Sequence, residues 1–179
     1  MRTIIHRPSD QASQGGQALV EFALVAPIFF LLLFGVIQLG LIFGGQNGVV
    51  AAARDTARYA STYRIATVAD ATDVCPLVLT QLTNDLGQFV PGFAPSREGT
   101  PVVSYTWLQN PDGPNGSPGS YYAQINVGVS YEFPLYVPIV SNIVDGWDGV
   151  IDQSARLSAH EEMRIENSAL AAGASEVDC

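Results

Sequence analysis

The chain has 179 residues, which is enough for one domain of ordinary size beside a membrane anchor. Its net charge is −9, and all eight basic residues are Arg. A surface this acidic lacks the basic patch that nucleic acids require, so the composition argues against a nucleic-acid partner.

Residues 1–16 carry Arg2 and Arg7 and have no apolar face, which indicates a cytoplasmic leader peptide outside the fold. An ordinary secretory signal is the competing interpretation, because residues 51–53 are all Ala and resemble a signal cleavage site. The apolar region of that signal would have about 22 residues, against about 7 to 15 in a typical one. The length therefore favours the leader.

The apolar run covers residues 22–43, where Gln38 is the only polar side chain. At about 1.5 Å per residue this run measures roughly 33 Å, enough to cross a bilayer. We assign residues 17–48 to a transmembrane helix region. Pro27 lies inside it and predicts a kink or a loosened turn near Ala23. Arg residues lie on both sides of the run, so the positive-inside count does not decide its orientation.

Glu21 stands at the edge of the apolar run. A carboxylate deep in a bilayer costs up to about 3 kcal/mol, so it requires a partner unless it lies at headgroup level in contact with water. A cut after Gly16 would make Gln17 the new N-terminus, one helical turn from Glu21. An amine and a carboxylate attract strongly in a low-dielectric layer, either within one chain or between neighbouring chains.

Residues 15–27, GGQALVEFALVAP, followed by the apolar run and by residues 51–60, AAARDTARYA, resemble the TadE-like family of the tight-adherence (Tad, or Flp) pilus machinery. Type IV prepilins and pseudopilins share the layout of cleavage point, acid and apolar helix. The resemblance covers residues 15–60, and the rest of the chain is similar only in general character.

The resemblance implies a pseudopilin or minor pilin that is cut by a prepilin peptidase after Gly16, with Glu21, Phe22 and Pro27 used in assembly. It implies a single-pass protein of the bacterial or archaeal cell envelope, with a cytoplasmic N-terminus and an extracytoplasmic domain. The expected partners are the membrane, the peptidase and other pilin or pseudopilin subunits. Such a protein is a substrate of an enzyme and is not itself an enzyme.

The helix is expected to continue to about residue 60, because residues 49–60 are rich in Ala and lack Pro and Gly. Val50, Ala53, Ala57 and Ala60 form a small-residue stripe on which a sheet can pack. Arg54, Arg58 and Tyr59 are possible partner contacts, and a solvated or ion-paired surface is the simpler interpretation.

Beyond residue 60 the pattern predicts a second helix over residues 73–89, capped by Asp73. Apolar residues then alternate over residues 103–107 and 123–133, a hairpin joined by the turn-forming residues 110–119. Residues 151–165 indicate a third strand, although a helix fits residues 156–166 equally well. The fold class is therefore α+β and pilin-like, with a three- to four-stranded antiparallel sheet in an extracytoplasmic domain over residues 49–167.

Cys75 and Cys179 are the two cysteines of the chain. Outside the cytoplasm they can pair and close a loop of about a hundred residues, which stabilises by up to about 4.7 kcal/mol. The alternative is two unrelated thiols. Residues 168–179 are expected to be a flexible tail unless Cys179 is tied down.

No catalytic motif, cofactor fingerprint or metal-binding spacing occurs in the sequence. His160, Glu161 and Glu162 are adjacent, but a strand directs neighbouring side chains to opposite faces, so we expect no metal site there. The competing function is a signal-anchored extracytoplasmic binding module without a pilus role. N-terminal sequencing of the extracted protein separates the two, since only the first predicts a chain that starts at Gln17.

Overall fold

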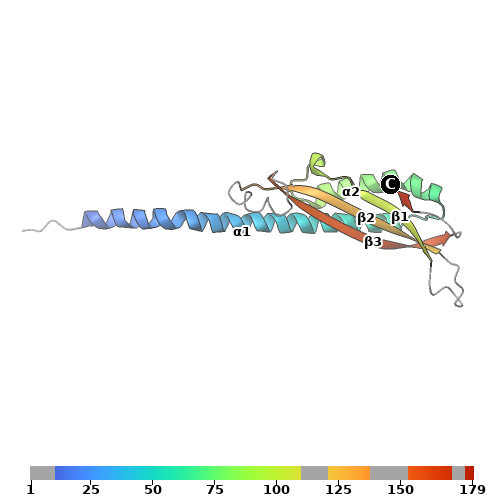
Figure 1. Ribbon diagram of the computed structural model, residues 1–179, viewed down its shortest axis with the longest axis horizontal. Coiled ribbons are helices and arrows are strands. Elements are labelled where there is room, and N and C mark those ends of the chain that lie inside the picture. Colours follow the sequence, from blue (N-terminus) through green and yellow to red (C-terminus); the bar gives the residue numbers. More distant parts are fainter. Residues whose placement is uncertain (1–10, 110–120, 138–152, 171–175) are drawn as a thin grey trace, which may run out of the picture.

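The computed structural model describes residues 11–109, 121–137, 153–170 and 176–179. Its elements are the helices α1 (Gln11–Ser61) and α2 (Val68–Phe89), a 3-10 turn η1 (Pro95–Arg97), and the strands β1 (Val102–Gln109), β2 (Tyr121–Pro134), β3 (Ser154–Leu170) and β4 (Val177–Asp178). The N-terminal half of α1 projects alone, and its C-terminal half packs with α2 and the sheet (Figure 1). The predicted α+β architecture is confirmed.

The four strands form one antiparallel sheet in the order β3-β2-β1-β4. Alternate residues of β2 are buried against the helices, as its period of two predicted. The segment that was compatible with either helix or strand is β3, in which Leu157 and Ile165 are buried and the even-numbered residues between them are exposed.

The C-terminal half of α1 packs against both α2 and the sheet. Its buried residues share one face of the helix and are mostly small: Val49, Ala52, Ala53, Thr56, Ala57 and Ala60. The predicted stripe was partly wrong, because Val50 is only half-buried while Val49 and Ala52 are fully covered. The stripe is wider than expected since two elements cover it.

Helix α2 begins five residues earlier than predicted, so the assignment of Asp73 as its cap is wrong. Thr67 is the N-cap, and its hydroxyl accepts a hydrogen bond from the Asp70 amide at 3.2 Å. The Asp70 carboxylate in turn accepts from the Thr67 amide at 2.8 Å. This reciprocal capping box satisfies the backbone amides of Thr67 and Asp70 at the start of the helix.

One polar contact lies inside the interface between α1 and α2. The Asp85 carboxylate is almost fully buried, and it accepts hydrogen bonds from the Thr56 hydroxyl at 2.8 Å and from the Gln81 side-chain amide at 2.7 Å. Burial raises the pKa of Asp85, and the two hydrogen bonds oppose that shift. The two helices are thus aligned by a specific contact within otherwise apolar packing.

A disulfide joins Cys75 of α2 to Cys179, with the two Cα atoms 5.3 Å apart. Next to it, β4 pairs with β1, and the Cys179 amide donates to the Val103 carbonyl at 2.8 Å. The expectation of a flexible tail over residues 168–179 excepted the case in which Cys179 is tied down, and that exception applies, because the disulfide and the β4 pairing hold the end of the chain. The start of that segment also belongs to β3, which extends to Leu170.

Four regions lie outside the described residues. They are residues 1–10 of the expected leader, the expected hairpin loop at 110–120, the connection at 138–152 and residues 171–175 of the expected tail. The predictions for these regions stay predictions. The part of the leader that is described, from Gln11 onward, is helical and continuous with α1.

Two glycines of α1 make a matched test of the helix packing. A Cβ on Gly48 would collide with the backbone oxygen of Phe89 and lie 2.8 Å from its carbonyl carbon, whereas a Cβ on Gly44 has no such atom within 4 Å. We expect Gly48→Ala to destabilise the fold by about 1 to 3 kcal/mol. Gly44→Ala should be neutral or stabilise by up to about 1 kcal/mol through helix propensity. Denaturant unfolding of the detergent-purified protein measures both, and equal stability of the two variants would contradict the close packing.

The disulfide predicts a redox-dependent stability. We expect Cys179→Ser to lower the free energy of unfolding by up to about 4.7 kcal/mol, since a long loop is no longer closed in the unfolded chain. Reduction of the unaltered protein should lower its melting temperature in the same way. A variant with both cysteines changed to Ser should not respond to reductant. Two free thiols in the membrane-extracted protein, measured by mass spectrometry, would refute the pairing.

Candidate functional site

The N-terminal half of α1 is uncovered. From Leu19 to Val36 every large apolar side chain is at least about two-fifths exposed. In the described part of the chain, α1 is the one helix that is long and apolar enough to span a membrane. A helix with this much exposed hydrocarbon is unstable in water, so it fits a single-pass membrane anchor.

The predicted processing point lies in this uncovered region. Gly16 is exposed, and a Cβ placed on it would meet no atom within 4 Å. In the uncut chain the bond between Gly16 and Gln17 is helical. Gly15 and Gly16 each weaken a helix by about 1 kcal/mol relative to Ala, so the helix is locally less stable at this point.

Glu21 forms a hydrogen bond with Gln17 in the full chain. The Gln17 side-chain amide donates a hydrogen bond to the Glu21 carboxylate at 3.0 Å, across one helical turn. Both residues are exposed. The structure thus brings together two of the predicted site residues. Their contact is made by the side-chain amide of Gln17, because the backbone nitrogen of Gln17 is part of a peptide bond in the full chain.

Phe22 and Pro27 belong to the same exposed region. The Phe22 ring is 66% exposed, and Pro27 lies within an unbroken helix. α1 is helical without a gap on both sides of the proline (Figure 1), and the kink or loosened turn near Ala23 stays a prediction. Proline removes one backbone donor, and the turns that flank it retain enough hydrogen bonds to continue the helix.

Sequence reasoning missed the role of Gln38. Its side chain is fully buried although it stands in the apolar run, and its Oε1 accepts hydrogen bonds from the amides of Tyr136 and Val137 at 2.9 and 3.2 Å. Its Nε2 has no hydrogen-bond partner among the described residues. The only available signal was one carboxamide in an otherwise apolar helix.

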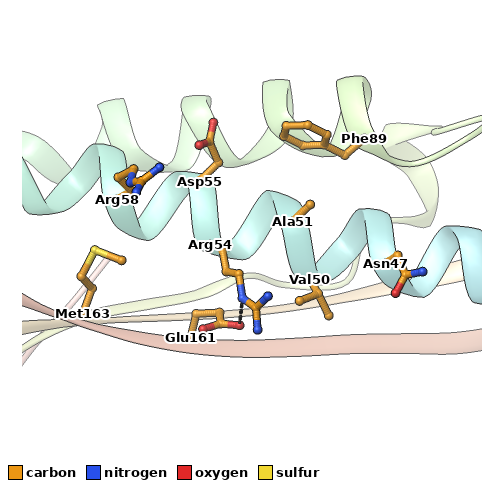
Figure 2. A pocket seen from close by; sticks show the side chains of 9 residues that line it. All are labelled: Asn47, Val50, Ala51, Arg54, Asp55, Arg58, Phe89, Glu161 and Met163. Carbon is orange, nitrogen blue, oxygen red and sulfur yellow. Dashed lines mark hydrogen bonds and ion pairs between the residues drawn. The ribbon is translucent and has the colours of Figure 1, made fainter.

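A groove of about 680 Å³ lies beside the C-terminal half of α1. Figure 2 shows the lining side chains, which come from α1, the end of α2 and β3. They are Asn47, Val50, Ala51, Arg54, Asp55, Arg58, Phe89, Glu161 and Met163. The groove mixes charges of both signs with a few apolar groups, and nothing in it forms a catalytic arrangement.

The three residues expected to contact a partner have different surroundings. Arg54 donates to Glu161 at 2.7 Å in an ion pair that crosses from α1 to β3. Arg58 is exposed and lines the same groove. Tyr59 is half-buried, and its hydroxyl lies 2.5 Å from that of Tyr63. Glu161 is a residue that sequence reasoning did not connect with Arg54.

The acidic cluster of β3 is divided between the two faces of the sheet. Glu161 points toward α1, while His160 and Glu162 lie on the opposite face, with the His160 Nε2 3.2 Å from the Glu162 carboxylate. Among the residues that the structure describes, no group of three or more His, Cys, Asp or Glu side chains is placed to hold a metal ion.

Comparison with known proteins gives one family match. Residues 16–58 match the family model described as "TadE-like protein". No curated protein and no solved structure matches the chain significantly. The matched segment begins at Gly16 and contains Glu21, Pro27 and the Arg54–Arg58 region of α1. Residues 16–58 are therefore TadE-like, which confirms the resemblance seen in the sequence and suggests a function related to the Tad pilus.

Proposed function

We propose that the chain is a TadE-like pseudopilin or minor pilin, cleaved by a prepilin peptidase after Gly16, that acts in the assembly of a Tad-type pilus or secretion system. The observation that carries the proposal is the family match over residues 16–58. It begins at Gly16, five residues before Glu21 and six before the start of the apolar run of α1 at Phe22. A cut there would release residues 1–16 and leave a chain that starts at the membrane anchor.

The proposed topology has the leader in the cytoplasm, residues 17–48 as the transmembrane region and residues 49–167 outside the cytoplasm. The disulfide between Cys75 and Cys179 supports this orientation, since disulfides persist in oxidising compartments. The location is then the bacterial or archaeal cell envelope. The peptidase and other pilin or pseudopilin subunits are the proposed partners, and we propose no catalytic activity for the chain itself.

Glu21 has the central role in the proposed assembly. The Glu21 carboxylate lies next to residue 17 in the uncut chain. Cleavage would place a positive amine on that residue, and the pair would lie in a layer of low dielectric where unlike charges attract strongly. A neighbouring subunit offers the same amine, so Glu21 can join two chains as well as close its own first turn.

Exposed residues of the groove are proposed as a second contact between subunits. Arg58 lines the groove, and Arg54 is already paired with Glu161. The competing proposal is a signal-anchored binding module whose ligand occupies this groove without any pilus role. That alternative predicts no cut after Gly16.

Gly16 tests the processing step. We expect Gly16→Phe to retain the leader, because a bulky ring beside the scissile bond blocks a peptidase that accepts small residues. Gly16→Ala is the matched control and should be processed. Intact mass measurement and N-terminal sequencing after expression with the peptidase separate the two forms. Full processing of Gly16→Phe, or a mature chain that does not start at Gln17, would contradict the proposal.

Glu21 tests the assembly step. We expect Glu21→Gln to insert and to be processed but to be impaired in incorporation, because the isosteric amide keeps the size and loses the charge. Glu21→Asp should retain part of the function. Membrane fractionation checks insertion, and co-purification with the other subunits checks incorporation. Normal incorporation of Glu21→Gln would exclude the charge pairing.

A further inference from the structure

The uncovered length of α1 is short for a bilayer. The helix is exposed on all sides only as far as Ile37, because the next residue, Gln38, is fully buried by the domain. From Phe22 to Ile37 the helix measures about 24 Å at about 1.5 Å per residue, against about 30 Å for the hydrocarbon core. The apolar run itself continues to Phe43, which would make up the difference.

The chain that follows β2 covers α1 at this level. Leu135 is buried, and the amides of Tyr136 and Val137 donate to the Gln38 carboxamide. An amide in hydrocarbon costs several kcal/mol when it lacks hydrogen bonds, so these donors make a polar residue tolerable inside the apolar run. The contact therefore fixes one end of the domain at the depth of Gln38.

The other sides of the molecule at this level are apolar and exposed. Leu39, Leu41 and Phe43 of α1 are 37 to 66% exposed, and the Tyr136 side chain is 57% exposed. The Tyr136 ring lies edge-on to Phe133, with ring centroids 6.3 Å apart. Tyrosine, which has an apolar ring and a polar hydroxyl, is enriched at the boundary between membrane and water.

We propose that the domain base, defined as residues 38–43 of α1 together with Leu135, Tyr136 and Val137, sits in the interfacial layer of the bilayer and binds lipid through its exposed side chains Leu39, Leu41, Phe43 and Tyr136. Gln38 holds the two parts of the domain base together. The inference rests on the proposed membrane anchoring and adds a second, peripheral contact with lipid. The domain then has a fixed depth and does not stand away from the membrane on a bare stalk.

Depth-dependent fluorescence quenching tests the proposal in the full chain. The variants Phe30→Cys, Leu39→Cys, Tyr136→Cys and Thr62→Cys are each labelled with an environment-sensitive dye, while Cys75 and Cys179 remain in their disulfide. The protein is reconstituted into phosphatidylcholine vesicles that carry nitroxides at a shallow or a deep position of the acyl chain. Iodide in the buffer measures exposure to water.

The label at Tyr136 should match the label at Leu39. Both should be quenched by the shallow nitroxide several-fold more than the label at Thr62, which lies at the far end of α1 and should respond to iodide. The label at Phe30 should respond to the deep nitroxide. A Tyr136 label that behaves like the Thr62 label overturns the proposal while leaving the anchor intact. A Phe30 label without lipid quenching would overturn the anchor and the domain base together.

A second copy of the chain could cover the exposed side chains of the domain base in place of lipid. Shielding of the Tyr136 label that increases with protein density and is insensitive to the lipid nitroxides would indicate that copy and overturn the lipid assignment. Gln38→Leu tests the hydrogen bonds that hold Tyr136 and Val137 against α1. We expect this variant to increase iodide quenching of the label at position 136, because the segment is no longer held at the level of Gln38. Gln46→Leu is the matched control, since it removes a hydrogen bond to the Ser158 carbonyl elsewhere on α1. Unchanged quenching in Gln38→Leu would overturn the role of Gln38.

Discussion

The close approach of α1 to its neighbours is the constraint on which the rest of the structure depends. Gly48 lies directly against the backbone at the end of α2, and a Cβ on Gly45 would lie 2.7 Å from the Phe133 ring. Together with the small residues that follow them, these glycines allow the C-terminal half of α1 to pack closely inside the domain. The large apolar side chains of the other half are exposed, and they suit a lipid environment.

Most of the architecture could be predicted from periodicity, and the errors have physical causes. The hydrophobic length of α1 and the alternation in β2 are local patterns, and both predicted their elements correctly. The cap of α2 was misassigned because Asp73 and the pair Thr67 and Asp70 are both plausible caps, and only the fold of residues 62–67 selects the second. The nature of β3 was ambiguous since charged residues occupy its solvent face.

The residues of the candidate site likewise fall into two groups: those that a local motif predicts and those that depend on contacts distant in the sequence. Gly16, Glu21 and Pro27 could be proposed from the sequence because their spacing is a local motif, and the family match covers that segment. Gln38 and Arg54 contact groups that are 98 and 107 residues away in the sequence. Such contacts depend on how the sheet is placed on α1, which no local pattern determines. The sequence marked Gln38 only as an exception and Glu161 only as part of an acidic cluster.

The ion pair between Arg54 and Glu161 has a consequence for how copies of this chain meet. Within the described residues β3 is an edge strand of the sheet, and its Ser158 carbonyl accepts a hydrogen bond from Gln46 of α1. Glu161 is a charge on its inward face, and inward charges on edge strands oppose pairing with the strand of another molecule. A continuous sheet across subunits is thereby disfavoured. The residue that pairs with Arg54 of α1 thus also guards this edge of the sheet against pairing with another molecule.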